Sequence, residues 1–414
     1  MRRIPAGALA ALLAACASSP GPRPDEEVAM DAILRSHPGL REVVAAADEH
    51  RLQVVLGLVE EGPGGRPVLR QHGFRLDEEY FYPASAVKLF AAVAALERLA
   101  ELRRETGLPI GADTALRFHP LFPGDELEDA DATNLEGGRI TVRHEIRKIF
   151  LVSDNQAFNR LYELLGQDVL AASLARAGFP DARIVHRLAE SRSADENRRS
   201  PRIELAGDGF TVPLPERTAA PPPPAPDVPG LRIGRAYLDG DQQVEGPMDF
   251  AGKNRVRLAD LQRALCMVVR PDVDCGGPGF ALGEDDRALL VEALGQLPRE
   301  SANPALDPAE VPDAYVKFVL PGVARVVPPE WLRVYDKSGQ AYGFTIENAW
   351  VVDRRTGRSF FLAATLYTNE DGVLNDDAYE YDEVALPFLA DLGEAVARWL
   401  GFGATGAAPA AGAS

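Results

Sequence analysis

The spacing of apolar residues changes from helical to extended within the first part of the chain. Over residues 27–50, apolar side chains recur every three or four positions with a break at Pro38, which predicts a helix. The runs 53–60 and 68–74 are separated by a glycine-rich turn and predict two paired strands. This hairpin comes shortly before the most apolar helix of the chain.

That apolar helix is predicted to begin at Ser85. Its positions are apolar almost all round until Glu97, so it is expected to lie in the interior. The segment 199–250 has no clear period and contains four consecutive prolines, which predicts an exposed insertion. Helical patterns also cover 141–166, 168–177, 256–270, 283–297 and 382–400, and strand patterns cover 331–337, 345–353 and 359–367.

This order of elements predicts an α+β protein. The strands near both ends can form one antiparallel sheet flanked by the terminal helices. The helical middle then forms a second, all-helical lobe, and a site is expected in the cleft between the two.

The first residues are typical of an export signal. Arg2 and Arg3 precede a short apolar core, which is too short to span a membrane. The run Leu13-Ala14-Ala15-Cys16 resembles a bacterial lipobox, in which Cys16 becomes the lipidated first residue. An ordinary signal peptide, cleaved near Ala15 or Ala17, is the alternative. We expect a location on the periplasmic side of the cell envelope, with a lipid anchor in the outer membrane.

The expected domain organisation follows from these patterns. A signal peptide occupies 1–16, a polar tether 17–27, the folded domain 28–400 and a disordered Ala/Gly-rich tail 401–414. Monomer is the default expectation.

Composition excludes several classes of partner. The formal net charge of −18 argues against nucleic acid and against electrostatic membrane binding, so contact with a membrane is expected only through the lipid anchor. Cys266 and Cys275 either form a disulfide or remain free, and two cysteines without a histidine cluster make no zinc site. No metal or cofactor is expected. The histidines form no catalytic motif, and His144 and His186 are expected to be structural.

Three short motifs dominate the chemistry that the sequence can support. They are Ser85-Ala86-Val87-Lys88, Ser153-Asp154-Asn155 and Lys337-Ser338-Gly339. Each pattern is weak alone, but S-x-x-K, S-D-N and K-[T/S]-G in this order are the active-site elements of the penicillin-recognising serine enzymes. The chain contains five lysines against 39 arginines, and two of the five stand in these motifs. Lysine can lose its proton under physiological conditions, whereas arginine cannot.

The first motif supplies a nucleophile and its base. Ser85 and Lys88 lie on one face at the start of a helix, and a lysine whose pKa is lowered by burial can take the serine proton. A simple helix cap at Ser85 with a solvated Lys88 is the alternative for this motif alone.

The other two motifs predict binding and proton transfer. Ser153 can relay a proton to the leaving group, Asn155 can bind substrate or Lys88, and Asp154 is expected to hold its loop. In the third motif, the lysine and serine can bind a substrate carboxylate, and the glycine allows close approach to the backbone. The alternative for the second motif is a simple helix cap. The alternative for the third motif is an exposed strand end followed by a turn. The backbone N–H groups of Ser85 and Gln340 are the candidate oxyanion hole. The third motif places Lys337, Ser338 and Gly339 in the substrate-binding set.

With these motifs, the chain resembles a class A β-lactamase-like serine hydrolase over roughly residues 27–400. The resemblance implies a β-lactamase/D,D-peptidase-like two-lobe fold and an acyl-enzyme on Ser85. It also implies a small-molecule β-lactam or a cell-wall peptide as substrate. The second and third motifs lie farther apart than in compact members of the family, and the insertion 199–250 accounts for the excess.

A second departure concerns the base for deacylation. The resemblance implies a loop with the pattern E-x-x-x-N, in which the glutamate activates a water molecule. Glu190 lies near the expected place, but Ala194 stands where the asparagine should be, and Glu196 directly precedes Asn197. Glu190 is the candidate base and Glu196 the weaker one, against the alternative of a solvated acidic loop.

Three functions stay open on this evidence. The leading hypothesis is an exported hydrolase that opens β-lactam rings. The second is a D,D-peptidase-type enzyme, or another amide or ester hydrolase of the cell envelope, that binds penicillin covalently. The third is a non-catalytic envelope lipoprotein that keeps the fold as a binding module.

Overall fold

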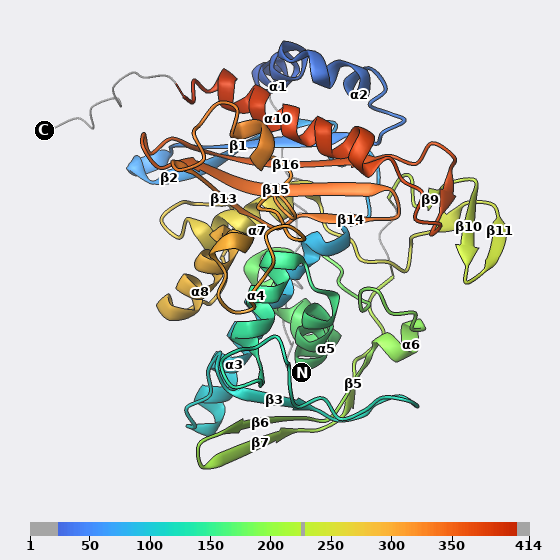
Figure 1. Ribbon diagram of the computed structural model, residues 1–414, viewed down its shortest axis with the longest axis vertical. Coiled ribbons are helices and arrows are strands. Elements are labelled where there is room, and N and C mark those ends of the chain that lie inside the picture. Colours follow the sequence, from blue (N-terminus) through green and yellow to red (C-terminus); the bar gives the residue numbers. More distant parts are fainter. Residues whose placement is uncertain (1–23, 225–227, 404–414) are drawn as a thin grey trace, which may run out of the picture.

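The computed structural model describes residues 24–224 and 228–403, and an antiparallel sheet forms its centre (Figure 1). The two ends of the chain build this sheet together, since β1 pairs with β16 and places Val55 opposite Ala363. The strand order is β13 (Leu332–Asp336), β15 (Phe344–Asp353), β16 (Ser359–Tyr367), β1 (Gln53–Glu61), β2 (Pro67–Phe74), with β14 (Gly339–Ala341) paired to β15.

Consecutive side chains of a strand point to opposite faces of the sheet, and both faces of this sheet are apolar. Val54 and Leu56 pack into one core, whereas Val55 between them packs into the other. The first core lies under the terminal helices, which cover one face of the sheet in Figure 1. These helices are α1 (Pro24–Ser36), α2 (Arg41–Ala45) and α10 (Leu386–Trp399).

The helical lobe lies on the opposite face. Its central helix α3 (Lys88–Thr106) is buried over most of its length, as its apolar sequence predicts. Around it lie α4 (Val142–Val152), α5 (Asn155–Ala177), α7 (Leu258–Val269) and α8 (Glu284–Gly295). An antiparallel sheet with a helical lobe confirms the predicted α+β fold class.

The segment 199–250, predicted as an exposed insertion, contains several short strands. Strands β6 (Ile203–Gly207) and β7 (Phe210–Leu214) form a small sheet with β3 (Ala115–Phe118) and β4 (Ile140–Thr141). Farther on, the hairpin of β10 (Ala236–Asp239) and β11 (Gln242–Glu245) pairs with β17 (Val373–Leu374). Strands of two to five residues carry too few positions for a detectable period.

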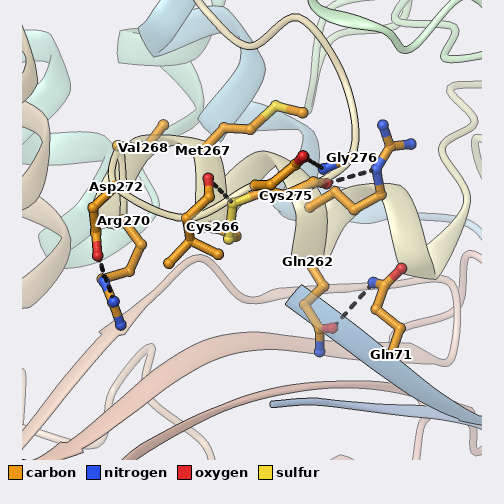
Figure 2. Close-up of a disulfide and its surroundings, with 12 residues drawn as sticks. Gln71, Gln262, Cys266, Met267, Val268, Arg270, Asp272, Cys275 and Gly276 are labelled. Atoms are coloured by element: carbon orange, nitrogen blue, oxygen red, sulfur yellow. Dashed lines mark hydrogen bonds and ion pairs between the residues drawn. A yellow bond between two sulfur atoms is a disulfide. The ribbon is translucent and has the colours of Figure 1, made fainter. Parts of the chain in front are cut away.

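The two cysteines of the folded domain form a disulfide. Cys266 on α7 is joined to Cys275, with 6.0 Å between their Cα atoms (Figure 2). On the same helix, Gln262 accepts a hydrogen bond at 3.0 Å from Gln71 of β2. The disulfide and this contact hold α7 and the segment after it against the sheet.

Some predictions concern the ends of the chain. Cys16, the signal peptide, most of the tether and the part of the predicted tail after Gly403 lie outside the described residues. Phe402 lies in the segment predicted as a tail, but its ring packs at 5.2 Å from that of Phe360, so the folded part extends past residue 400. Among the described residues, the structure contains no helix of sufficient length and apolarity to span a bilayer.

Candidate active site

Ser85 lies on a short turn of 3-10 helix, η3 (Ala84–Val87), that leads directly into α3. The residue before it, Ala84, has φ 45°, which bends the chain sharply in front of the serine. Lys88 begins α3, and its backbone N–H donates to the carbonyl oxygen of Ser85. Ser85 is half-buried while its neighbours in the turn are buried, so the chain presents this one side chain to the cleft.

The second motif lies where α4 ends and α5 begins. Ser153 terminates α4 in the left-handed conformation, with φ 54°. Asp154 caps α5, because its Oδ1 accepts from the N–H of Ala157 at 2.7 Å, and its Oδ2 lies 3.7 Å from Nζ of Lys148. Asp154 therefore holds its loop, as expected, and leaves Ser153 and Asn155 to face Lys88.

The Nζ atom of Lys88 joins the first two motifs. It donates to the carbonyl oxygen of Ser153 and to Oδ1 of Asn155 at 2.7 Å, and it lies 3.3 Å from Oγ of Ser153. Burial, with the nearby charge of Lys337, holds the pKa of Lys88 well below its usual range. A neutral amine that donates to two oxygens keeps its lone pair free to accept a proton.

Lys337, at the end of β13, reaches the same serine from the sheet side. Its Nζ lies 3.0 Å from Oγ of Ser153 and 2.6 Å from the carbonyl oxygen of Ser338. Burial lowers the pKa of Lys337 to about 8, against the opposing attraction of Asp336 and Glu347. Two lysines therefore converge on the Ser153 hydroxyl.

The rest of the third motif has a more structural setting than its sequence suggests. The hydroxyl of Ser338 donates to the carbonyl oxygen of Val316, and the side chain is buried. A Cβ on Gly339 would lie 2.7 Å from the backbone nitrogen of Ser85 and 2.9 Å from that of Ala86. The glycine is thus required because β14 packs directly on the nucleophile turn.

Gln340 follows at the cleft. It pairs with Thr345 of β15 and lines the same cavity as Ser85. The N–H of Ser85 stands among the first residues of η3, where backbone donors have no partner within the helix. These positions fit the predicted oxyanion hole, which remains a prediction.

Glu190 lies on the wall of this cleft. Its Oε1 accepts from Nδ2 of Asn159 at 3.0 Å, and its Oε2 accepts from Nε of Arg192 at 3.3 Å. Asn159 belongs to α5 and also exchanges hydrogen bonds with the backbone of Leu188 at 3.0 and 2.9 Å. The asparagine that contacts this glutamate therefore comes from a helix rather than from the loop, and no sequence spacing could have identified it.

Glu196 has a different role. Its Oε2 accepts from the N–H of Ser193 at 2.8 Å, while its own N–H donates to the serine hydroxyl, which forms a capping box for α6 (Ala194–Asn197). The carboxylate stabilises a helix end at the surface. The geometry therefore favours Glu190 over Glu196 as the candidate base.

Arg187 and Asn197 hold the loop that carries Glu190. The guanidinium of Arg187 is fully buried and donates to Glu163 and to the carbonyl oxygen of Arg199, at 2.8 and 2.9 Å. Oδ1 of Asn197 accepts from the N–H of Arg187 at 2.9 Å. The sequence did not indicate that these two residues hold the loop. An arginine in a polar loop is usually exposed to solvent, whereas Arg187 is buried.

The histidine nearest the site is neutral. Burial lowers the pKa of His186 to about 4. Its ring stacks on Tyr82, its Nδ1 lies 2.6 Å from the carbonyl oxygen of Arg187, and its Nε2 accepts from the N–H of Asn254. His186 thus builds the cleft wall, in line with the structural role expected for it.

These groups share one cavity of about 940 Å³. Ser85, Asn155, Glu190 and Gln340 all line it, whereas Lys88 and Lys337 are buried behind it. The cavity is thus placed to hold a substrate against Ser85, with the proton-transfer groups protected from water.

Among the described residues, one group of side chains has the spacing of metal ligands, formed by His37, Asp391 and Glu394. Arg325 donates to both carboxylates at 2.7 and 2.9 Å, so its positive charge already occupies the place of a cation. The group joins η1 (Pro38–Leu40) to α10, outside the cleft.

A match to one protein-family model agrees with the resemblance. Residues 72–205, which carry the first two motifs and Glu190, match the model of the "Beta-lactamase enzyme family". No curated protein matches. Solved structures that align include a β-lactamase from Desulfarculus baarsii (19% identity, 91% of this chain and 98% of that chain, TM-score 0.47). Another is a β-lactamase from Streptosporangium roseum (16% identity, 88% and 98%, TM-score 0.46). The family match supports the assignment to the penicillin-recognising serine enzymes.

Proposed function

We propose that this chain is a penicillin-recognising serine enzyme, namely a class A-like hydrolase that opens β-lactam rings through an acyl-enzyme on Ser85. The observation that carries the proposal is the position of Ser85. It faces a large cleft, directly before a buried lysine of lowered pKa that contacts Ser153 and Asn155.

The proposed acylation uses Lys88 as the base for Ser85. Lys88 takes the proton of the Ser85 hydroxyl, and Oγ bonds to the carbonyl carbon of the lactam. The N–H groups of Ser85 and Gln340 stabilise the oxyanion. The carbon–nitrogen bond of the ring then breaks, and the hydroxyl of Ser153 passes its proton to the nitrogen. Lys88 lies 3.3 Å from that hydroxyl and can return the proton it accepted.

Deacylation requires water and a base. Glu190 is the candidate, because its carboxylate lines the cleft and is oriented by Asn159. It would take a proton from water, whose oxygen attacks the carbonyl carbon of the ester. The bond from that carbon to Oγ of Ser85 then breaks, and the proton returns to Oγ, which regenerates the serine and the carboxylate.

A D,D-peptidase-type or other amide or ester hydrolase of the cell envelope is the second candidate. The observation that favours it is the carboxylate of Glu190, which also accepts from Arg192. A carboxylate already engaged by a guanidinium has less capacity to hold a water molecule. Penicillin would then acylate Ser85, and the acyl-enzyme would be hydrolysed slowly.

Export and lipid anchoring through Cys16 are part of the proposal. The Cys266–Cys275 disulfide supports export, because disulfides persist mainly in oxidising compartments outside the cytoplasm. The test is fractionation of cells that express the full chain or its Cys16→Ala variant. The proposal predicts that the wild type sediments with membranes and that the variant is released from them. Equal membrane association of the wild type and the variant would overturn the proposal of a lipid anchor at Cys16.

The test of catalysis is intact-mass spectrometry of the purified protein over time with excess benzylpenicillin. A transient adduct with product accumulation would identify a β-lactamase. A persistent adduct that Ser85→Ala abolishes would identify the penicillin-binding hydrolase. Absence of an adduct would favour the third hypothesis, a non-catalytic binding module.

A further inference from the structure

Lysine is rare in this chain, and the fold buries four of the five lysines. Lys88 and Lys337 belong to the motifs, whereas Lys148 and Lys317 do not. Lys317 is fully buried close to the third motif. A buried ammonium is unfavourable unless a carboxylate and further hydrogen-bond acceptors compensate its lost hydration. The position of Lys317 therefore depends on the partners that surround it.

The carboxylate partner of Lys317 is Asp336, the last residue of β13 and the neighbour of Lys337 in the chain. Nζ of Lys317 donates to Oδ1 of Asp336 and, at 2.8 Å, to the carbonyl oxygen of Leu294 near the end of α8. Neither side chain of this ion pair is exposed to solvent. The pair thus lies where α8 meets the strand that leads into the third motif (Figure 1).

The segment that carries Lys317 is attached to the same strands on both sides of the lysine. The carbonyl oxygen of Val316 accepts from the hydroxyl of Ser338. The N–H of Val319 donates to Oε2 of Glu347, on β15, at 3.0 Å. These two contacts fix the backbone around Lys317, so its ammonium is held beside Asp336.

Asp336 lies close to a second cation, Lys337. Burial lowers the pKa of Lys337, and among the neighbouring charges that of Asp336 opposes this effect most strongly. Oδ2 of Asp336 is buried and has no hydrogen-bond partner among residues 24–224 and 228–403, so it could accept from a second ammonium. Nζ of Lys337 nevertheless lies 3.0 Å from Oγ of Ser153, on the cleft side. Lys337 is therefore directed to the serine although an acidic neighbour is available.

Two other ionisable groups influence Lys337 or its surroundings. Both oxygens of Glu347 already accept from backbone N–H groups, those of Val319 and Asn348, and burial raises the pKa of this carboxyl to about 8. Lys88, on α3, carries a charge of the same sign as Lys337 and approaches Ser153 from the other side. Asp336 is thus the carboxylate that can compete with Ser153 for Lys337.

We propose that Lys317 is a positioning residue of the active site, which neutralises Asp336 and so leaves the ammonium of Lys337 to Ser153. Lys317 acts through Asp336 and contacts neither the substrate nor the reacting atoms. The inference rests on the proposed function, because it concerns the hydroxyl that passes its proton to the leaving nitrogen.

The test measures the acylation rate constant of the purified protein with benzylpenicillin by intact mass, from pH 6 to pH 10. Lys317→Met leaves Asp336 as an uncompensated buried carboxylate, which should draw Lys337 away from Ser153. We expect acylation to be slower by about 10²-fold, as displacements of about 1 Å in an active site produce. The decline near pH 8 should also move to higher pH, because an ammonium that is paired with a carboxylate holds its proton more firmly.

A second single variant, Lys317→Gln, removes the charge but keeps a hydrogen-bond donor for Asp336. It should change the rate and the pH dependence in the same direction, with less risk to folding. The double variant Lys317→Met with Asp336→Asn should recover at least about tenfold of the loss, because no carboxylate then competes for Lys337. Its decline should return toward pH 8.

Asp353→Asn is the matched control. Asp353 is fully buried like Asp336, but it lies at the opposite end of the same pair of strands, where it is opposite Leu332. Its replacement should lower resistance to urea and leave the rate and pH dependence of acylation unchanged. Urea unfolding of every variant separates a loss of stability from a loss of rate in the folded protein.

Wild-type acylation in folded Lys317→Met or Lys317→Gln would overturn the proposal, since Lys317 would then contribute to stability alone. A loss of rate that Asp336→Asn does not relieve would also overturn it, because the effect would not pass through Asp336. Absence of an adduct in the wild type would instead overturn the proposed function, and the positioning role with it.

Discussion

The Nζ atom of Lys337 lies 3.0 Å from Oγ of Ser153, although 184 residues separate them in the sequence. This contact joins the sheet to the helical lobe across the cleft. From the other side, Lys88 reaches the same hydroxyl at 3.3 Å. Ser153 is therefore the point where the three motifs meet.

The charge of Lys337 should determine how the acylation rate constant changes with pH on the alkaline side. Burial lowers its pKa to about 8, so its ammonium loses the proton as the pH rises through this value. Acylation should therefore fall above about pH 8, because the positively charged donor to Ser153 is lost. The measurement is the acylation rate constant between pH 6 and pH 10.

The variant Lys337→Arg provides the control for this assignment, because a guanidinium stays charged throughout that range. Its acylation should be slower overall but should lack the decline near pH 8. The same decline in both proteins would assign it to a different group.

Glu190 should control deacylation. Glu190→Gln is expected to accumulate acyl-enzyme and to reduce steady-state hydrolysis by about 10²- to 10⁴-fold, the usual contribution of a general base. Asn159→Ala should cause a smaller loss, because the carboxylate itself remains, although the loop loses the hydrogen bond to Glu190 and both hydrogen bonds to Leu188. Burst kinetics with a chromogenic cephalosporin would separate acylation from deacylation.

Glu196→Gln is the matched control, since that carboxylate caps α6 at the surface. Its turnover should stay close to that of the wild type. Unchanged turnover in Glu190→Gln would show that the hydrolytic water is activated elsewhere.

Gly339 should tolerate no side chain. In Gly339→Ala the new Cβ would lie 2.7 Å from the backbone nitrogen of Ser85, so β14 or the nucleophile turn must move. Overpacking of this kind costs about 1–3 kcal/mol, and the shift should slow acylation at least tenfold by displacing the oxyanion donors. Urea unfolding and acylation kinetics measure the two effects.

A glycine in open space serves as the comparison. No atom lies within 4 Å of a Cβ built on Gly111, so Gly111→Ala should leave both quantities nearly unchanged. Equal effects of the two substitutions would refute the steric account.

The disulfide should contribute to stability but not to chemistry. Replacement of both Cys266 and Cys275 by alanine should lower the free energy of unfolding by about 2–3 kcal/mol, the chain-entropy value for a short loop. Acylation of Ser85 should persist, since neither cysteine lines the cleft. Alkylation of unreduced, denatured protein is the direct check, and two labelled cysteines would rule out the bond.

Long elements with a clear period could be predicted from the sequence. The apolar residues that follow Ser85 predicted a buried helix, and α3 is buried over most of its length because helices without a polar face must lie inside. The strand patterns 345–353 and 359–367 correspond to β15 and β16. The short strands in 199–250 could not be predicted, since two to five residues give no detectable period.

The candidate site divides in a similar way. Ser85, Lys88, Ser153 and Lys337 could be identified because their spacing within each motif is local. Asn159 could not, because it meets Glu190 only where α5 packs against the loop. Ser338 was expected to face substrate, but its hydroxyl donates to Val316, a contact that depends on the packing beside β13.

The sequence by itself determined which residue types are available and in what order: a serine and lysine on one helix turn, a capped helix junction and a lysine at a strand end. Local backbone preferences and side-chain chemistry are sufficient for that. Only the tertiary structure decided that the two lysines converge on Ser153, that both are desolvated, and that β10 lines the cleft. Burial and distance between remote segments set pKa values and cavities, and neither is a property of local sequence.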